Sequence, residues 1–169
     1  MRAADDADFT SFVAASSRRL LRGAYLITGD LADAEDLLQT ALERAYRRWP
    51  TIRRMDAPEA YVRRIIVTSA INAGRRRRVH GSPLDEAQLP GLPDPAVEDM
   101  AGRVALAALV RQLPAGQRAV LVLRYFDDLT EAETARVLGC TVGTVKSQHA
   151  RAMVRLRALV ASQQDGSRA

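Results

Sequence analysis

The sequence has few of the residues on which disulfides, secretion and membrane insertion depend. Cys140 is the only cysteine among 169 residues, so no intrachain disulfide is possible, as is usual in a reducing compartment. The first residues, MRAADDADF, are acidic and lack the apolar core of a signal peptide. No apolar run approaches the roughly 20 residues that cross a bilayer. We therefore expect a cytoplasmic protein without membrane insertion.

Residue patterns that are typical of enzymes are also missing. The sequence contains no phosphate-binding glycine loop, no nucleophile elbow and no Glu-x-x-His spacing of a di-iron bundle. Its two histidines, His80 and His149, fall in a proline-rich segment and in a charged helix, with no convergent set of carboxylates around them. The sequence therefore predicts no catalytic residue, no cofactor, no metal and no small-molecule substrate.

Aromatic residues make up only 5% of the chain, whereas 47% of it is hydrophobic. The core must therefore consist mostly of Leu, Val, Ile and Ala. Long runs of Ala, Leu, Arg and Glu without β-branched alternation favour helices over strands. The fold class that we predict is all-α.

The prolines mark the domain organisation. The segment VHGSPLDEAQLPGLPDP, residues 79–95, holds four of the seven prolines and cannot sustain a helix or a central strand. The expected organisation is two small helical domains, 1–78 and 96–163, joined by an extended linker, 79–95, and followed by a disordered tail, 164–169. The alternative is a long loop inside one domain, but loops beyond about 15 residues are uncommon there.

Helix signals divide each predicted domain further. In the first, Thr28-Gly29-Asp30 closes one helix, Pro50 stops a second, and the spacing of Asp56 and Glu59 predicts a capping box for a third. In the second, one helix is expected to end near residue 112, and Pro114 to start the next.

The segment TEAETARVLGCTVGTVKSQHARA, residues 130–152, is typical of a helix-turn-helix motif. Thr130 and Glu133 are spaced as a capping box, Gly139 can adopt the left-handed conformation that ends a helix, and Thr141 can cap the next. Ala135 is small where the helices should cross, and Val145 is on the inner face of the second. The alternative is an amphipathic helical hairpin with a solvated charged face.

Charge patterning favours a polyanionic partner. The net charge is +5, and eight arginines between residues 53 and 78 are opposed there only by Asp56 and Glu59. A solvated run of charges is the alternative for that cluster. Because one helix-turn-helix offers few base contacts, it needs a second half-site or a tether to bind specifically.

Together these residues resemble the extracytoplasmic-function sigma factors of the sigma-70 family, and most closely the small actinobacterial SigE-like subfamily. The resemblance is carried by DAEDLLQTALERAY, residues 33–46, in combination with LTEAETARVLGCTVGTVKSQ, residues 129–148, and covers about residues 9–159. It implies that the chain directs core RNA polymerase to promoters. Domain 1–78 would bind the polymerase clamp and melt the −10 element, and domain 96–163 would read the −35 element.

The resemblance also implies roles for particular residues. Polymerase contacts are expected on the clamp helices of the beta-prime subunit and on the beta flap, and an anti-sigma factor is a further expected partner. At Thr68 and Gln148 the sequence departs from many relatives, which carry Asn and Arg there. The implied polymerase-binding residues are Asp36, Gln39 and Glu43; those for the −10 element are Arg63, Arg64, Asn72, Arg75 and Arg76; those for the −35 element are Thr141, Thr144, Lys146, Ser147, Gln148 and Arg151.

A free-standing helix-turn-helix regulator of transcription remains the alternative function. Such a regulator would bind a specific operator without polymerase, whereas the resemblance implies that polymerase provides the tether.

Overall fold

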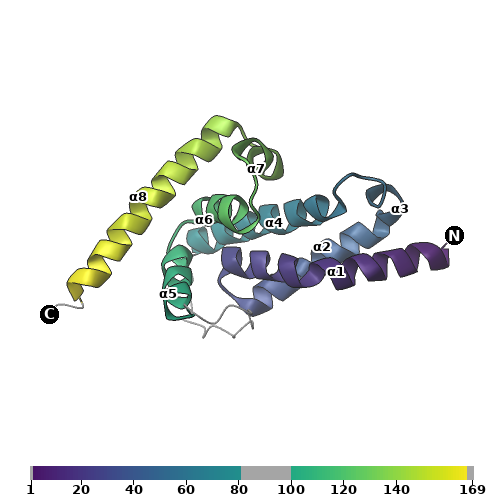
Figure 1. The fold of residues 1–169 in the computed structure, drawn as a ribbon, viewed down its shortest axis with the longest axis horizontal. Coiled ribbons are helices and arrows are strands. Elements are labelled where there is room, and N and C mark those ends of the chain that lie inside the picture. Colours follow the sequence, from purple (N-terminus) through teal and green to yellow (C-terminus); the bar gives the residue numbers. More distant parts are fainter. Residues whose placement is uncertain (1, 81–99, 167–169) are drawn as a thin grey trace.

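The computed structural model describes residues 2–80 and 100–166, and this part of the chain is built from helices without a strand (Figure 1). The all-α prediction is therefore confirmed. The elements are α1 (Arg2–Thr28), α2 (Leu31–Arg47), α3 (Trp49–Ile52), α4 (Pro58–His80), α5 (Met100–Arg111), α6 (Ala115–Leu121), the π-helical turn η2 (Val122–Phe126), α7 (Glu131–Leu138) and α8 (Val142–Gly166).

Helices α1 to α4 form the first half of the molecule around an apolar core. Gly29 has a φ of 75° and ends α1, as expected, and the Asp30 carboxylate then accepts a 2.8 Å hydrogen bond from the Asp33 N–H and caps α2. The buried face of α2 packs on α1 and α4. The buried residues of this core are Leu20, Ala24, Tyr25, Ala34, Leu38, Ala41, Ala45, Trp49, Ile52, Val62 and Ile66.

The connection from α2 to α4 differs from the sequence prediction. Helix α2 ends at Arg47, and Pro50 is the second residue of the short helix α3, a position where proline fits because its missing N–H would have no helical partner. Trp49 is buried against Phe9 and Phe12, with ring centroids about 5 Å away, and fixes α3 against α1. Helix α4 begins at Pro58, two residues after the Asp56 that was expected to cap it.

Helices α5 to α8 form the second half, and α8 extends beyond the other helices as a long rod (Figure 1). Helix α5 ends at Arg111 and α6 begins after Pro114, both as predicted. Of the predicted linker, residues 79 and 80 continue α4, and the other residues lie outside the described part of the chain. Helix α8 continues to Gly166, three residues into the segment that was expected to be a disordered tail.

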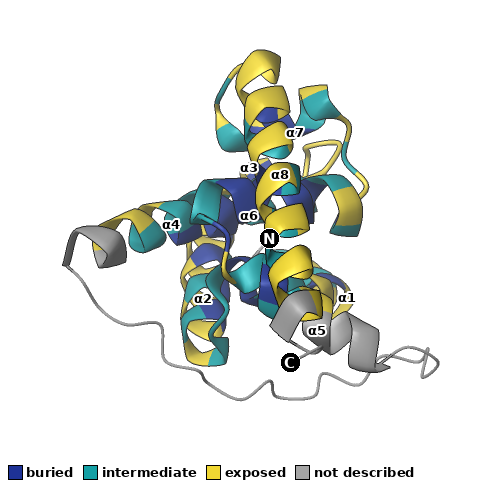
Figure 2. Cartoon of the chain, turned by 90° about the vertical axis from the view of Figure 1, so that its left-hand side faces the viewer, coloured by how far each residue is buried: buried dark blue, intermediate teal, exposed yellow. Residues whose placement is uncertain are grey.

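The two halves share a second apolar core. Ile27 of α1 and Val67 and Ala70 of α4 pack with Ala119 of α6 and with residues of η2 and α7. The closest approach is at Gly74 of α4, where an added Cβ would lie 2.9 Å from the Cβ of Ala115. The halves therefore pack directly on each other, and Figure 2 shows buried residues where α4 and α6 lie side by side. The other buried members of this core are Val122, Leu123 and Val137.

Candidate nucleic-acid and polymerase interfaces

The helix-turn-helix has the local structure that the sequence predicts. The Thr130 hydroxyl accepts a hydrogen bond from the Glu133 N–H at 3.2 Å, and the Glu133 carboxylate accepts one from the Thr130 N–H at 2.7 Å. The bond from the Thr130 N–H, and a further 2.7 Å bond from the Thr130 hydroxyl to the same carboxylate, lower the pKa of Glu133 because they stabilise its ionised form. Gly139 ends α7 with a φ of 67°, and the Thr141 hydroxyl accepts a 3.1 Å hydrogen bond from the Thr144 N–H at the start of α8.

The inner surfaces of the motif pack on α6. Ala135 and Val145 are buried with Val120, and Leu138 and Cys140 cover this small cluster. Cys140 packs against this cluster as a small apolar residue, and burial raises the pKa of its thiol. This cluster fixes the position of α8 relative to α7.

The predicted −35 residues lie together on the first three turns of α8. Five of them are exposed and Gln148 is half-buried. The Lys146 ammonium is 3.8 Å from the Glu131 carboxylate, a weak exposed pair that does not prevent it from reaching a phosphate. The exposed five are Thr141, Thr144, Lys146, Ser147 and Arg151.

The predicted −10 residues lie on two sides of α4. Arg64, Asn72 and Arg75 are exposed and fall on one helical face, because their spacing of eight and three residues is close to whole turns. Arg76 is also exposed. Arg63 points instead toward the second half of the molecule, and only 11% of its side chain is exposed. In this arrangement Arg63 is withdrawn from solvent.

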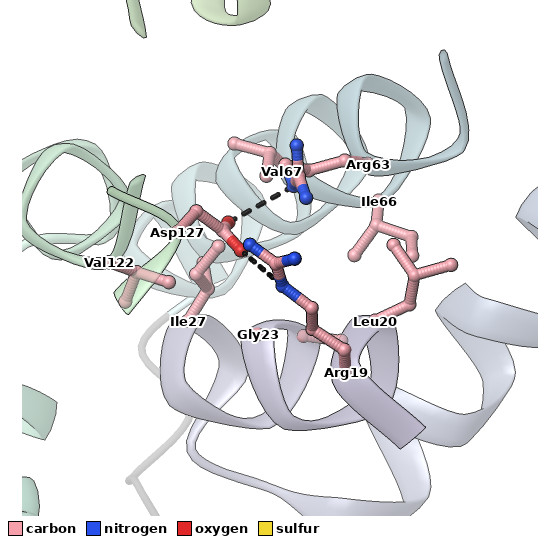
Figure 3. A pocket seen from close by; sticks show the side chains of 10 residues that line it. Arg19, Leu20, Gly23, Ile27, Arg63, Ile66, Val67, Val122 and Asp127 are labelled. Carbon is pink, nitrogen blue, oxygen red and sulfur yellow. Dashed lines mark ion pairs between the residues drawn. The ribbon is translucent and has the colours of Figure 1, made fainter. Parts of the chain in front are cut away.

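Arg63 belongs to an ion cluster centred on Asp127, which directly follows η2 (Figure 3). The Arg63 Nε lies 3.1 Å from one Asp127 oxygen, and the Arg19 Nε lies 3.6 Å from the other. The Arg63 guanidinium also donates a 2.7 Å hydrogen bond to Glu59. A buried carboxylate of the second half thus holds two arginines of the first.

Burial has the largest effect on the Asp127 carboxyl. With 5% of its side chain exposed, desolvation raises its pKa, while the charges of Arg63 and Arg19 lower it only in part. The ion pairs with Arg63 and Arg19 therefore offset part of the free-energy cost of burying the Asp127 charge. This cluster could not be predicted from the sequence, because Asp127 and Arg63 are 64 positions apart. Asp127 follows an apolar helix, as an ordinary capping or turn residue would.

Acidic residues near the start of α1 contact the connection between α2 and α4. Arg53, which directly follows α3, forms a hydrogen-bonded ion pair with Asp5 and lies 3.3 Å from Asp8. The Tyr46 hydroxyl donates a 2.8 Å hydrogen bond to Asp6 of the same helical turns. The acidic first turns of α1 thus hold the connection between α2 and α4 against α1.

The predicted polymerase-binding residues lie on the outer side of α2. Asp36, Gln39 and Glu43 are exposed, whereas Leu38 and Ala41 of the same helix are buried. Asp36 also lines a cavity of about 140 Å³ between α1, α2 and α4. The structure brings these three side chains to one surface and leaves their role a prediction.

Two family models match the chain and together span both halves. Sigma-70 region 2 matches residues 12–79, and sigma-70 region 4 matches residues 103–156. The RNA polymerase sigma-E factor of Streptomyces coelicolor is 40% identical over 151 residues, which cover 89% of this chain and 84% of that protein. The chain therefore belongs to the sigma-70 family of RNA polymerase sigma factors.

Other relatives and solved structures agree with this assignment. The extracytoplasmic-function sigma factor SigM of Mycobacterium tuberculosis is 34% identical over 148 residues, covering 85% of this chain and 72% of that protein. The fold is similar to the sigma factor RpoE in its complex with the anti-sigma factor NepR from Bartonella quintana. That match has a TM-score of 0.71 and 22% identity, and covers 91% of this chain and 97% of the other.

A similar fold is found in CnrH in complex with the cytosolic domain of CnrY. The TM-score is 0.63 at 22% identity, with 93% of this chain and 90% of the other covered.

Among the described residues, no helix is long and apolar enough to span a membrane.

Proposed function

We propose that this chain is an extracytoplasmic-function sigma factor that binds core RNA polymerase in the cytoplasm, directs it to promoters and acts there without a catalytic site of its own. The observation that carries the proposal is the joint presence of a capped helix-turn-helix with an exposed basic start of α8 and of an arginine-rich α4 beside it. The similarity to named sigma factors over nearly the whole chain supports it.

Each half of the chain has its own role in this proposal. The first domain, 1–78, binds the polymerase clamp through Asp36, Gln39 and Glu43 and melts the −10 element with α4. The second domain, 96–163, places the start of α8 in the major groove of the −35 element, where short polar groups reach base edges and Lys146 and Arg151 reach phosphates or guanine. The segment that follows α4 keeps both domains on one polymerase, which supplies the tether that a single recognition helix needs.

An anti-sigma factor is a further proposed partner. The sigma factor RpoE was co-crystallised with the anti-sigma factor NepR, and CnrH was solved in complex with the cytosolic domain of CnrY. Because both structures are only 22% identical to this chain, the likeness shows the fold alone. The proposal therefore covers the kind of partner and not the contact residues.

In vitro transcription tests the function. Core polymerase is incubated with genomic fragments, including the promoter of the protein's own gene, with and without the full chain. New transcripts are expected only when the chain is present. The Asp36→Ala/Gln39→Ala variant should bind core polymerase more weakly, and Thr10→Ala, an exposed change on α1, is its control.

Two results would contradict the proposal. One is the absence of any sigma-dependent transcript together with no binding to core polymerase. The other is tight, sequence-specific binding of the free protein to a duplex operator, which would favour the free-standing regulator instead.

A further inference from the structure

Tyr125 is the most exposed aromatic side chain of the described residues, and it lies beside the proposed −35 surface. It is 63% exposed, whereas Trp49, for example, is buried. The Tyr125 hydroxyl lies 2.8 Å from the Nε2 of His149 on α8, and the two ring centroids are 5.8 Å apart. Among the described residues, neither of these two side chains has another hydrogen-bond partner. The pair therefore has hydrogen-bonding capacity left for a partner outside the chain.

The π-helical turn η2 carries Tyr125 to the surface. The Asp127 N–H donates a 3.1 Å hydrogen bond to the Val122 carbonyl, five residues back, so this turn holds one residue more than an α-helical turn. Val122 and Leu123 are buried, while Tyr125 is exposed. Single π-helical turns are frequent at functional sites. An exposed ring with a polar tip suits a contact that is apolar on one side and wet on the other.

His149 places the Tyr125 hydroxyl at the edge of the −35 surface. On α8 it is half-buried, one turn after the buried Val145 and three residues after the exposed Lys146. An α-helix with its side chains is about 10–12 Å wide, and the major groove of B-DNA is about 12 Å wide. When the start of α8 lies in the groove, residues on the flank of the helix therefore face the phosphates of the groove wall.

The chemistry of the pair suits a phosphate. A neutral imidazole carries its proton on either Nδ1 or Nε2. With the proton on Nε2, His149 donates to the Tyr125 oxygen and leaves the hydroxyl hydrogen for a second acceptor. A phosphate oxygen is such an acceptor, and tyrosine hydroxyls are among the groups that bind DNA phosphates. Lys146, one turn earlier on α8, adds positive charge on the same helix.

We propose that Tyr125 and His149 extend the −35 interface: the Tyr125 hydroxyl binds a phosphate of the promoter duplex, and His149 is the positioning residue that orients this hydroxyl. The proposal rests on the proposed function, because it takes the start of α8 as the helix that reads the −35 element. A phosphate contact carries no base information, so this one strengthens binding to every −35 sequence by a similar factor.

The experiment measures the affinity of the holoenzyme, which is core polymerase with the full chain, for a promoter duplex identified by transcription. Tyr125→Phe removes the hydroxyl and keeps the ring. Tyr46→Phe is the matched control, because it removes another exposed tyrosine hydroxyl, one that bonds Asp6 in the first half of the molecule. Affinity should fall about tenfold in Tyr125→Phe, as for a lost hydrogen bond to a charged group. It should not change in Tyr46→Phe.

Neutral phosphate analogues separate a DNA contact from a structural contact between η2 and α8. Each duplex of a series carries one methylphosphonate at a phosphate that flanks the −35 element. At the contacted phosphate, the analogue should cost Tyr125→Phe about tenfold less affinity than it costs the unmodified chain, because the bond is already missing. The salt dependence of binding should be the same in Tyr125→Phe and the unmodified chain, because tyrosine is uncharged, whereas Lys146→Ala should reduce its slope.

Variants of His149 test its positioning role. His149→Phe keeps a ring without nitrogen and should weaken binding, but it should add no loss in a Tyr125→Phe background, since His149 acts through the hydroxyl. His149→Gln supplies an amide that can bond the hydroxyl, so it should retain most of the affinity. Additive losses in the double variant would overturn the positioning role.

The proposal is also overturned if Tyr125→Phe matches Tyr46→Phe in affinity. An equal loss in Tyr125→Phe on every methylphosphonate duplex would overturn it as well, because the pair would then only connect η2 to α8. Failure of the proposed function looks different. In that case the holoenzyme with the unmodified chain neither binds the promoter nor initiates transcription.

Discussion

At the scale of single residues, promoter reading depends on the exposed side chains at the start of α8. Arg151 is exposed there, and the proposed function places it at the −35 element. Arg151→Ala should lower initiation at −35-dependent promoters by about 5- to 150-fold, the range of a lost guanine contact of 1–3 kcal/mol. Binding to core polymerase should not change. Arg157→Ala, an exposed change farther along α8, is the control, and an equal fall in polymerase pull-down would contradict the role.

The buried carboxylate makes a prediction about pH. Asp127 faces Arg63, Arg19, Glu59 and Asp128, and burial raises its pKa above the ordinary 3.8. The folded state therefore binds this proton more tightly than the unfolded state, so the contribution of Asp127 to stability increases as pH falls through the raised pKa and is lost as pH rises. In urea unfolding between about pH 7 and about pH 4, the native chain should gain stability relative to Asp127→Asn. A constant difference would show that the carboxyl is not perturbed.

Asp127 also shows which contacts could not be predicted from the sequence. Thr130, Gly139 and Thr141 act through partners within four residues, so their roles as caps and helix end were visible in the sequence. Asp127 and Arg63 meet because two distant segments pack, and neither carries a local signal of that contact. The exposure of Arg64 and the burial of Arg63 likewise follow from which side of α4 the second half covers.

At the scale of elements, the stability of α7 depends on its capping box. Thr130→Ala removes the hydroxyl that accepts from the Glu133 N–H, and a lost N-cap costs about 1 kcal/mol. The midpoint of urea unfolding should fall, and the Glu133 amide should exchange faster with solvent. In Thr10→Ala the lost hydroxyl bonds only a carbonyl of its own helix, so little change is expected. Equal effects of the two changes would show that the cap does not support α7.

Element boundaries could be predicted where a local signal acts alone. Gly29 with Asp30, and Pro114, ended and began helices as expected. Pro50 did not stop α2, because Trp49 is drawn into the first core and begins a new turn that places the proline at a tolerated position. Helix α2 thus ends before the proline, at Arg47, and a tertiary contact decides where the next helix begins.

At the scale of the whole molecule, the shared core should make the two halves unfold together. Ile27 is buried in that core, and Ile27→Ala should destabilise the chain by 2–5 kcal/mol because it leaves a cavity where α1 meets the second half. Calorimetry of the unmodified chain should show one transition. In Ile27→Ala the second half should unfold first, since α6 to α8 lose a contact that the first core does not replace. Ile66→Ala, in the first core alone, should instead lower the stability of α1 to α4. If the unmodified chain unfolds in two separate steps, the halves are independent and the shared core does not couple them.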